Sequence, residues 1–296
     1  MSESPSHAAP STPPITPFRV AALQMVSTPD PARNLAEAER LIADAAAQGA
    51  QLVLLPEYFC FMGHKDTDKL AIREAYGDGP IQRFLADAAQ RHGVWIIGGT
   101  LPLKAPEETR VLNTTLVFDP SGAERARYDK IHLFNFEKGA ESFDEARTIR
   151  PGTEVQTFDA PFGRVGLSVC YDLRFPELYR RMGGQDGCAL MVVPSAFTYT
   201  TGRAHWEILL RARATENQCY VLAAAQGGTH ENGRRTWGHS MLIDPWGEVV
   251  DVLDENPGVV IGNLDLDRIA AVRARLPAWR HRVLHRARPT RARHLK

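Results

Sequence analysis

Three chemically reactive side chains each accompany an apolar run of the kind that forms a buried strand. Cys170 ends the run GLSVC, Glu57 closes QLVLLPE, and Lys130 lies in RYDKIHLF. A thiol has an ordinary pKa near 8.5, so attack at neutral pH requires a base or a positive charge beside it. Glu57 could take the thiol proton, and Lys130 could hold the oxyanion that forms when Cys170 adds to a carbonyl. If the fold brings them together, the three side chains predict a nucleophilic site.

Each of the three residues also has an ordinary explanation. Cysteine is among the most buried residue types, so Cys170 taken alone is explained by packing. Glu57 and Lys130 taken alone would be a surface carboxylate and a surface ammonium. Charges are rarely buried without partners, so all three make sense at the ends of buried segments if they meet. Spacing along the chain does not decide between these explanations.

The elements that must position these side chains alternate between strand and helix patterns. Apolar runs of strand length occur at residues 19–25, 51–57, 94–100, 163–172, 189–196 and 219–226, and helical spacing occurs at 34–50, 81–93, 176–184 and 204–218. Two hairpins are predicted, turning at residues 119–122 and 244–247, and the strand pattern after the first turn continues past Lys130 to Phe134. Interleaved helices favour parallel pairing while hairpins require antiparallel pairing. The sequence therefore predicts an α/β fold with mixed sheets.

Length and composition favour one large domain with a neutral surface. The chain has 296 residues, of which 44% are hydrophobic, and its formal net charge is zero. We expect a disordered Pro/Ser-rich leader at 1–17, one domain at 18–280 and a basic tail at 281–296. The tail is either a nucleic-acid or membrane tail or, as the neutral chain favours, a solvated extension or a subunit-contacting arm. Nothing in the charge balance indicates a nucleic-acid partner, and no apolar run approaches the roughly 20 residues of a membrane helix. The four cysteines have no paired spacing, which favours a reducing cytoplasm over a disulfide framework.

The sequence predicts neither a metal site nor an organic cofactor. The dinucleotide, phosphate-loop, serine-hydrolase and zinc-protease motifs are all missing. Histidines lie in separate segments without ligand spacing and are interpreted as structural: His132, His205, His230 and His239. Arg211 and Arg213 are expected to form ion pairs on a helix face. Trp206, Trp237, Trp246 and Trp279 are expected to be core or interface anchors.

Three separated segments resemble the signature motifs of the nitrilase superfamily of carbon–nitrogen hydrolases. They are LPE at 55–57, DKIHLF at 129–134 and CYDLRFPE at 170–177, in the family's order. The resemblance covers residues 18–280 and implies a catalytic triad of Glu57, Lys130 and Cys170. A second family glutamate, which positions the substrate or its attacking water, matches Glu145, with Glu141 nearby in the same loop. The resemblance further implies an α-β-β-α sandwich that pairs into a homodimer or higher homo-oligomer through a helical layer, with no cofactor.

Later segments resemble one branch of this superfamily more than its neighbours. Residues 194–230 and 237–250 resemble the Nit1 branch, the deaminated glutathione amidases; PSAF at 194–197 and AAAQ at 223–226 favour it over the ω-amidases that act on α-ketoglutaramate. The resemblance implies hydrolysis of a terminal carboxamide of a small α-keto-acid amide through a thioester of Cys170, releasing an amine or ammonia. The alternatives are ω-amidase activity, hydrolysis of N-carbamoyl compounds or nitriles, and a catalytically silent scaffold.

Six residues are candidates for contact with the substrate. Arg174 either pairs with a substrate carboxylate or forms a structural salt bridge to Asp172 or Glu177. Tyr58 is either core or a wall of the substrate pocket, and Tyr171 is expected to supply a backbone N–H to the oxyanion. Three residues after a strand end either line the pocket or form an ordinary turn: Phe197, Thr198 and Thr201.

Overall fold

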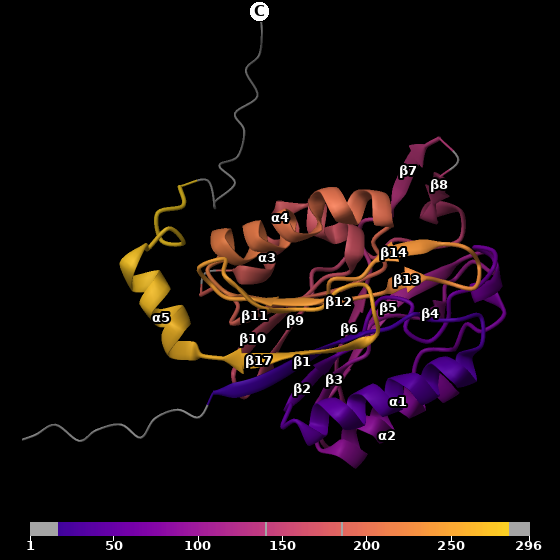
Figure 1. The fold of residues 1–296 in the computed structure, drawn as a ribbon, viewed down its shortest axis with the longest axis horizontal. Helices are drawn as coiled ribbons and strands as arrows, with labels where there is room; N and C mark the ends of the chain where they lie inside the picture. The colour runs from indigo at the N-terminus through magenta and orange to yellow at the C-terminus, as the bar shows by residue number, and fades with distance from the viewer. Residues whose placement is uncertain (1–16, 140, 185, 284–296) are drawn as a thin grey trace, which may run out of the picture.

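The computed structural model describes residues 17–139, 141–184 and 186–283 (Figure 1). The predicted leader lies outside the described residues except for residue 17, and so does the predicted basic tail except for residues 281–283. Among the described helices, none is long and apolar enough to cross a membrane.

Two mixed β-sheets pack between two helical layers (Figure 1). The first sheet has the order β17 (Gly258–Leu264), β1 (Phe18–Gln24), β2 (Leu52–Leu54), β3 (Trp95–Ile97), β5 (Val111–Phe118) and β4 (Leu101–Lys104), with β6 (Glu124–Asp129) paired to β5. The second has the order β16 (Val249–Val252), β15 (Met241–Ile243), β12 (Tyr220–Ala225), β11 (Leu190–Ser195), β10 (Gly163–Leu167) and β9 (Thr157–Ala160). Each sheet combines parallel and antiparallel pairs. The predicted α/β class and the α-β-β-α sandwich are confirmed.

The helices cover the two outer faces of the sheet pair. Helices α1 (Pro31–Ala47) and α2 (Pro80–His92) lie on the first sheet, α3 (Pro176–Gly183) and α4 (Tyr199–Asn217) lie on the second, and α5 (Leu266–Arg275) lies at one end (Figure 1). Helices α1 and α4 begin earlier than predicted because each has a capping side chain. Asp30 accepts hydrogen bonds from the first turn of α1, and the Thr198 hydroxyl accepts the N–H of Thr201 in α4.

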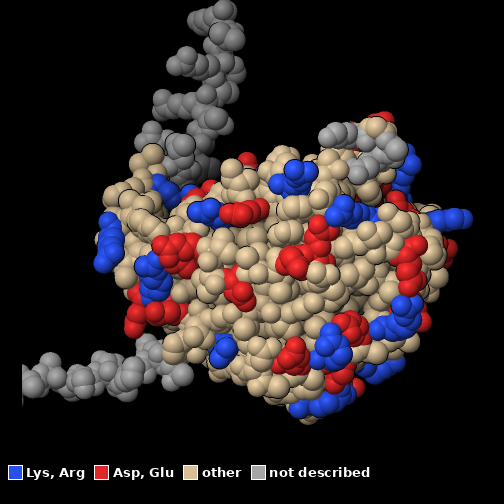
Figure 2. All heavy atoms as spheres, viewed as in Figure 1, with Lys and Arg blue, Asp and Glu red and all other residues tan. Residues whose placement is uncertain are grey.

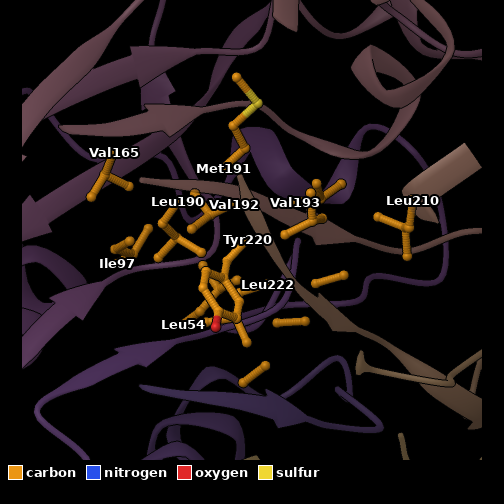
Figure 3. Packing of buried hydrophobic residues seen from close by; sticks show 14 of the residues in the cluster. Leu54, Ile97, Val165, Leu190, Met191, Val192, Val193, Leu210, Tyr220 and Leu222 are labelled. Carbon is orange, nitrogen blue, oxygen red and sulfur yellow. The ribbon is translucent and has the colours of Figure 1, made fainter. Parts of the chain in front are cut away.

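Strands β1 and β2 are buried on both faces, as the continuous apolar run at 51–57 predicts for β2. Val20 and Ala22 of β1 face the second sheet, whereas Ala21 and Leu23 face α1 and α2. This alternation is the period of two that a pleated strand requires. Figure 3 shows the core between the sheets, where residues of the first sheet and of the second pack together: Leu54, Ile97, Val165, Leu190, Val192 and Leu222.

The strands before Lys130 and Cys170 end earlier than the sequence predicts. Strand β6 ends at Asp129, and the main chain of Lys130 instead bonds to Asn113 and Gly152. Strand β10 ends at Leu167, and Cys170, whose φ of 50° is incompatible with a strand, is the first residue of the 3₁₀ helix η3 (Cys170–Arg174). Both reactive side chains therefore lie on loops just beyond strand ends.

The sequence patterns above do not predict several elements. They are β4, β9, β17, α5, the hairpins β7 (Asn135–Lys138) with β8 (Glu141–Asp144) and β13 (Gly227–Thr229) with β14 (Arg235–Trp237), and the 3₁₀ helices η1 (Asp68–Leu70) and η2 (Glu145–Arg147). Both predicted hairpins, β5 with β6 and β15 with β16, are confirmed.

The surface seen in Figure 2 mixes both signs of charge. Lysine and arginine side chains lie among aspartate and glutamate on this face, with wide uncharged areas between them. This face therefore offers no continuous field of one sign, in agreement with the zero formal charge of the chain.

Candidate active site

Glu57, after β2, Lys130, after β6, and Glu145, in η2, form one buried hydrogen-bonded cluster. The Lys130 Nζ donates to Glu57 Oε1 at 2.9 Å and to Glu145 Oε2 and Oε1 at 2.8 and 3.0 Å. The Lys130 and Glu57 side chains are 0% and 1% exposed, and that of Glu145 is 14% exposed. An ammonium has three N–H donors, so these contacts occupy the full donor capacity of Lys130.

Glu57 lies in the turn after β2, where both of its carboxylate oxygens are fixed. Oε1 also accepts from Asn113 Nδ2 at 3.0 Å, and Oε2 accepts from the backbone N–H of Ala196 at 2.9 Å. Gln226, at the end of β12, donates from Nε2 to the Glu57 carbonyl at 3.1 Å. Asn113 and Gln226 were not predicted as site residues. A buried polar side chain within an apolar strand was the only sequence signal for Asn113.

Cys170 is held in an unusual backbone conformation by a buried carboxylate. Its φ of 50° lies in the left-handed region, which costs a non-glycine residue energy unless its surroundings impose it. Asp172 accepts the Val169 N–H at 2.9 Å, the Tyr128 hydroxyl at 2.7 Å and the His132 N–H at 3.0 Å. These bonds tie the loop after β10 to the end of β6, and so fix Cys170 relative to Lys130.

The electrostatics of the cluster favour a protonated thiol and charged partners. Burial raises the pKa of the Cys170 thiol well above its ordinary value; the Glu57 and Glu145 carboxylates raise it further, and Lys130 opposes them. For Lys130, burial favours a lower pKa, but Glu145 and Glu57 outweigh it and raise the pKa above its usual range. For Glu145, burial favours a higher pKa, but Lys130 lowers it overall. The thiol therefore rests as S–H within the field of two carboxylates and an ammonium.

Glu145 opens η2, and Tyr58 contacts it directly. The Tyr58 hydroxyl donates to Glu145 Oε1 at 2.9 Å, and the Phe134 N–H donates to Glu145 Oε2 at 2.8 Å. Burial, followed by the charge of Glu145, raises the pKa of Tyr58 well above its ordinary value. Tyr58 is thus a neutral donor that orients Glu145, and it also lines a cavity.

Cys170 opens onto a narrow pocket of about 10 Å³, and this pocket adjoins a cavity of about 520 Å³. The predicted substrate-contacting residues other than Tyr58 all line the narrow pocket: Tyr171, Arg174, Phe197, Thr198 and Thr201. Both hollows share four lining residues: Phe134, Glu145, Thr198 and Arg234. The site is therefore a narrow pocket beside a larger cavity.

Arg174 forms no ion pair with any described residue. Its Nη1 lies 3.2 Å from His205 Nδ1, and its guanidinium carbon lies 5.3 Å from the centroid of the Phe197 ring. Arg174 forms the alternative salt bridge with neither Asp172 nor Glu177. The Asp172 carboxylate instead binds His132, the Tyr128 hydroxyl and the Val169 N–H. Arg174 is thus available for an anion in the narrow pocket.

The remaining charged and aromatic candidates have ordinary roles. The four histidines bond to protein groups in separate places: His132 to Asp172, His205 to Arg174, His230 to Ser27 and Thr236, and His239 to Trp237. No group of three or more metal-binding side chains occurs among the described residues. Arg211 and Arg213 pair with Glu207 and Glu216, as predicted for ion pairs on α4. Trp206 is buried, whereas Trp246 is half exposed.

Comparisons with known proteins agree with this arrangement. The carbon–nitrogen hydrolase family matches residues 19–274. The chain is 45% identical over 272 residues to deaminated glutathione amidase of Synechocystis sp., covering 90% of this chain and 98% of that protein. It is 37% identical over 269 residues to human omega-amidase NIT2, covering 90% and 96%. The crystal structure of the Caenorhabditis elegans NitFhit protein matches with a TM-score of 0.84 and 39% identity, covering 90% of this chain and 65% of that one.

Proposed function

Since this chain belongs to the carbon–nitrogen hydrolase family and is an amidase, we propose that it hydrolyses the amide of a small α-keto acid, with deaminated glutathione as substrate and Cys170 as nucleophile. The observation that carries the mechanism is the buried Glu57–Lys130–Glu145 cluster, whose charges act on the Cys170 thiol. The choice of substrate is supported by the similarity to deaminated glutathione amidase of Synechocystis sp..

The first half-reaction begins with proton transfer from the Cys170 thiol to Glu57. The raised pKa of the thiol makes a base necessary, because only the thiolate attacks well. The sulfur then bonds to the amide carbon, and Lys130 and the Tyr171 N–H stabilise the oxyanion. Proton transfer neutralises Glu57 and so weakens its bond to Lys130. We propose that this frees one ammonium N–H of Lys130 for the oxyanion, since all three are engaged at rest.

The first half-reaction ends when the C–N bond breaks, Glu57 gives its proton to the leaving amine, and the acyl group stays on Cys170 as a thioester. The second half-reaction returns Cys170 to its resting form. Water, positioned by Glu145 and deprotonated by Glu57, attacks the thioester carbon and releases the acid. The thiol regains a proton from Glu57. None of these steps requires a metal ion or an organic cofactor.

We propose that Arg174 binds the carboxylate on the acyl side of the substrate. It lines the narrow pocket with Cys170 and has no carboxylate partner among the described residues. Phe197 would pack against the acyl chain, and Thr198 and Thr201, whose hydroxyl oxygens lie 2.9 Å apart, would shape the pocket while capping α4. Arg174→Met should raise KM for α-keto-acid amides more than for amides without the α-carboxylate.

A second candidate is ω-amidase activity on α-ketoglutaramate, which the similarity to human omega-amidase NIT2 supports. The test is release of amine or ammonia across deaminated glutathione, α-ketoglutaramate, N-carbamoyl compounds and nitriles. Our proposal expects the largest kcat/KM for deaminated glutathione. A strong preference for α-ketoglutaramate would replace it with the ω-amidase function, and turnover of none of them would favour a silent scaffold.

We further propose that the chain acts as a homodimer of one domain, residues 18–280, in the cytoplasm. Ile208 on α4 is 68% exposed, and Val249, Val250 and Val252 of β16 are 37%, 48% and 45% exposed. These exposed apolar side chains, on α4 and on the edge strand β16, favour burial against a second copy. All four cysteines are free, as suits a reducing compartment. Light scattering on the purified protein should give twice the 32.8 kDa chain mass.

A further inference from the structure

The 3₁₀ helix η3, which carries the Cys170 thiol and the Tyr171 N–H, is held at its first end by Asp172. The Asp172 carboxylate accepts the Val169 N–H at 2.9 Å, and the Asp172 N–H donates to the Val169 carbonyl at 3.0 Å. A helix of five residues has few internal hydrogen bonds, so its position depends on contacts at its ends. The second end of η3 therefore needs a comparable contact if the helix is to stay in place.

The Leu173 carbonyl at the second end of η3 cannot gain a partner by continuation of the helix. In a 3₁₀ helix each carbonyl accepts the N–H three residues later, as the Asp172 carbonyl does from Phe175. The residue three positions after Leu173 is Pro176, which has no N–H. Leu173 is 0% exposed, so bulk water does not reach its carbonyl, and an unpaired buried carbonyl would cost free energy.

Arg213 of α4 supplies the missing donors. Its Nε and Nη2 donate to the Leu173 carbonyl at 3.1 and 2.7 Å, and its Nη1 donates to Glu216 Oε1 at 2.8 Å. The Arg213 side chain is 5% exposed, whereas that of Glu216 is 27% exposed. The planar guanidinium places two N–H groups on one oxygen, an arrangement that an ammonium on a flexible stem does not reproduce. A buried charge thus fixes one carbonyl of the loop that carries the nucleophile.

Helix α4 carries a second arginine with the same kinds of contact in a different place. Arg211 donates from Nε to the Gly247 carbonyl at 2.8 Å and from Nη1 to Glu207 Oε1 at 3.2 Å. Gly247 lies in the turn between β15 and β16 and lines neither the narrow pocket nor the larger cavity. Each arginine therefore binds one carbonyl and one glutamate, but only Arg213 reaches the loop that contains Cys170.

Building on the proposed function, in which Cys170 is the nucleophile, we infer that Arg213 is a positioning residue of the reaction. It lines neither hollow and acts through Leu173. With Asp172 at the opposite end of η3, it keeps the Cys170 thiol and the Tyr171 N–H directed at the same substrate carbonyl. Loss of its two bonds would leave the Leu173 carbonyl unpaired, and η3 would shift to pair it. Because the oxyanion develops only in the transition state, the cost should fall on kcat more than on KM.

The test compares Arg213→Lys with Arg211→Lys in steady-state hydrolysis of deaminated glutathione or α-ketoglutaramate, whichever the wild-type enzyme turns over faster. Arg213→Lys keeps the charge but loses the paired donors, so kcat should fall by about tenfold or more while KM stays within about threefold of wild type. Arg211→Lys is the matched control and should leave kcat and KM within about twofold of wild type. Arg213→Gln carries the same expectation as Arg213→Lys if the lysine variant is recovered only unfolded.

A further variant separates the bonds to Leu173 from the ion pair. Glu216→Gln removes the negative charge but keeps an acceptor oxygen for Nη1 and both bonds to Leu173, so its kcat should stay within about threefold of wild type. Equal losses of kcat in Glu216→Gln and Arg213→Lys would assign the effect to the ion pair and overturn the inference.

An unchanged kcat in folded Arg213→Lys would also overturn the inference. If urea unfolding showed a lower free energy of unfolding in that variant, Arg213 would stabilise the fold without positioning η3. The proposed function, on which the inference rests, fails separately, if the wild-type enzyme turns over neither amide.

Discussion

Glu145→Gln is the substitution that most sharply separates a working cluster from a merely structural one. Glu145 accepts two hydrogen bonds from Lys130, one from the Tyr58 hydroxyl and one from the Phe134 N–H. Glutamine keeps the shape but offers one acceptor oxygen and an NH₂ donor. In the variant, the NH₂ group therefore faces one of the donors whose hydrogen bond a carboxylate oxygen accepts in the wild type. Lys130 also loses one of its two counter-ions.

The size of the effect follows from the burial of the pair. Removal of one partner of a buried ion pair costs about 3–5 kcal/mol. If Lys130 is thereby withdrawn from the transition state, that energy corresponds to a loss of about 10²- to 5 × 10³-fold in kcat. Tyr58→Phe removes a single hydrogen bond to the same carboxylate, worth about 1.5–3 kcal/mol at most, so its loss in kcat should be smaller.

The assay is steady-state hydrolysis of deaminated glutathione, with thermal unfolding as a check that each variant folds. Glu108→Gln, at an exposed position between β4 and β5, provides the matched control and should leave kcat within about twofold of wild type. A folded Glu145→Gln enzyme with kcat within threefold of wild type would refute the reasoning. The same holds if Tyr58→Phe lost more activity than Glu145→Gln.

Three further predictions concern residues around the cluster. Asn113→Ala removes a donor to Glu57 Oε1 and should lower kcat about tenfold in the same assay with little change in KM; an unchanged kcat would show that Asn113 does not orient Glu57. Iodoacetamide should modify Cys170 before Cys188 or Cys219, because Cys170 lines the narrow pocket and the other two line neither hollow; peptide mass mapping gives the order, and earlier labelling of Cys188 would contradict it. Burial lowers the pKa of His230 from 6.5 to about 4, so as the pH falls the unfolded chain takes up a proton before the folded chain does. The free energy of unfolding should therefore fall by about 2 kcal/mol from pH 7 to pH 5. Urea unfolding should show a weaker dependence of this free energy on pH in His230→Gln, and an equal dependence in both proteins would exclude His230 as its cause.

The sequence predicts the layers of the fold better than its edges. Strands β1 and β2 have apolar runs long enough to stand out, and buried positions alternate between two cores in both. Strand β17 and helix α5 have weaker patterns, because much of their surface is exposed. The backbone at Cys170 was also beyond prediction, since a positive φ at a non-glycine residue is imposed by tertiary contacts such as those of Asp172.

The residues of the candidate site were likewise only partly predictable from the sequence. Glu57 and Lys130 meet as two of the three motifs suggest, because each motif follows the end of a core strand, and Glu145, matched separately from the motifs, joins them. Asn113 gives only a weak signal, a polar residue within an apolar strand, and Gln226 gives none, since their importance comes from what the fold places next to them. The sequence leaves two roles open for Arg174, and the structure shows no ion pair of Arg174 among the described residues, which is why we propose the substrate role.

The most direct test of the account is detection of the acyl-enzyme on Cys170. Rapid acid quench during turnover, followed by peptide mass spectrometry, should find the α-keto acyl group on the peptide that contains Cys170. The same adduct should form from amides that share the acyl group but differ in the amine, and Cys170→Ala should neither form it nor turn over. Full amidase activity in folded Cys170→Ala would contradict the central claim.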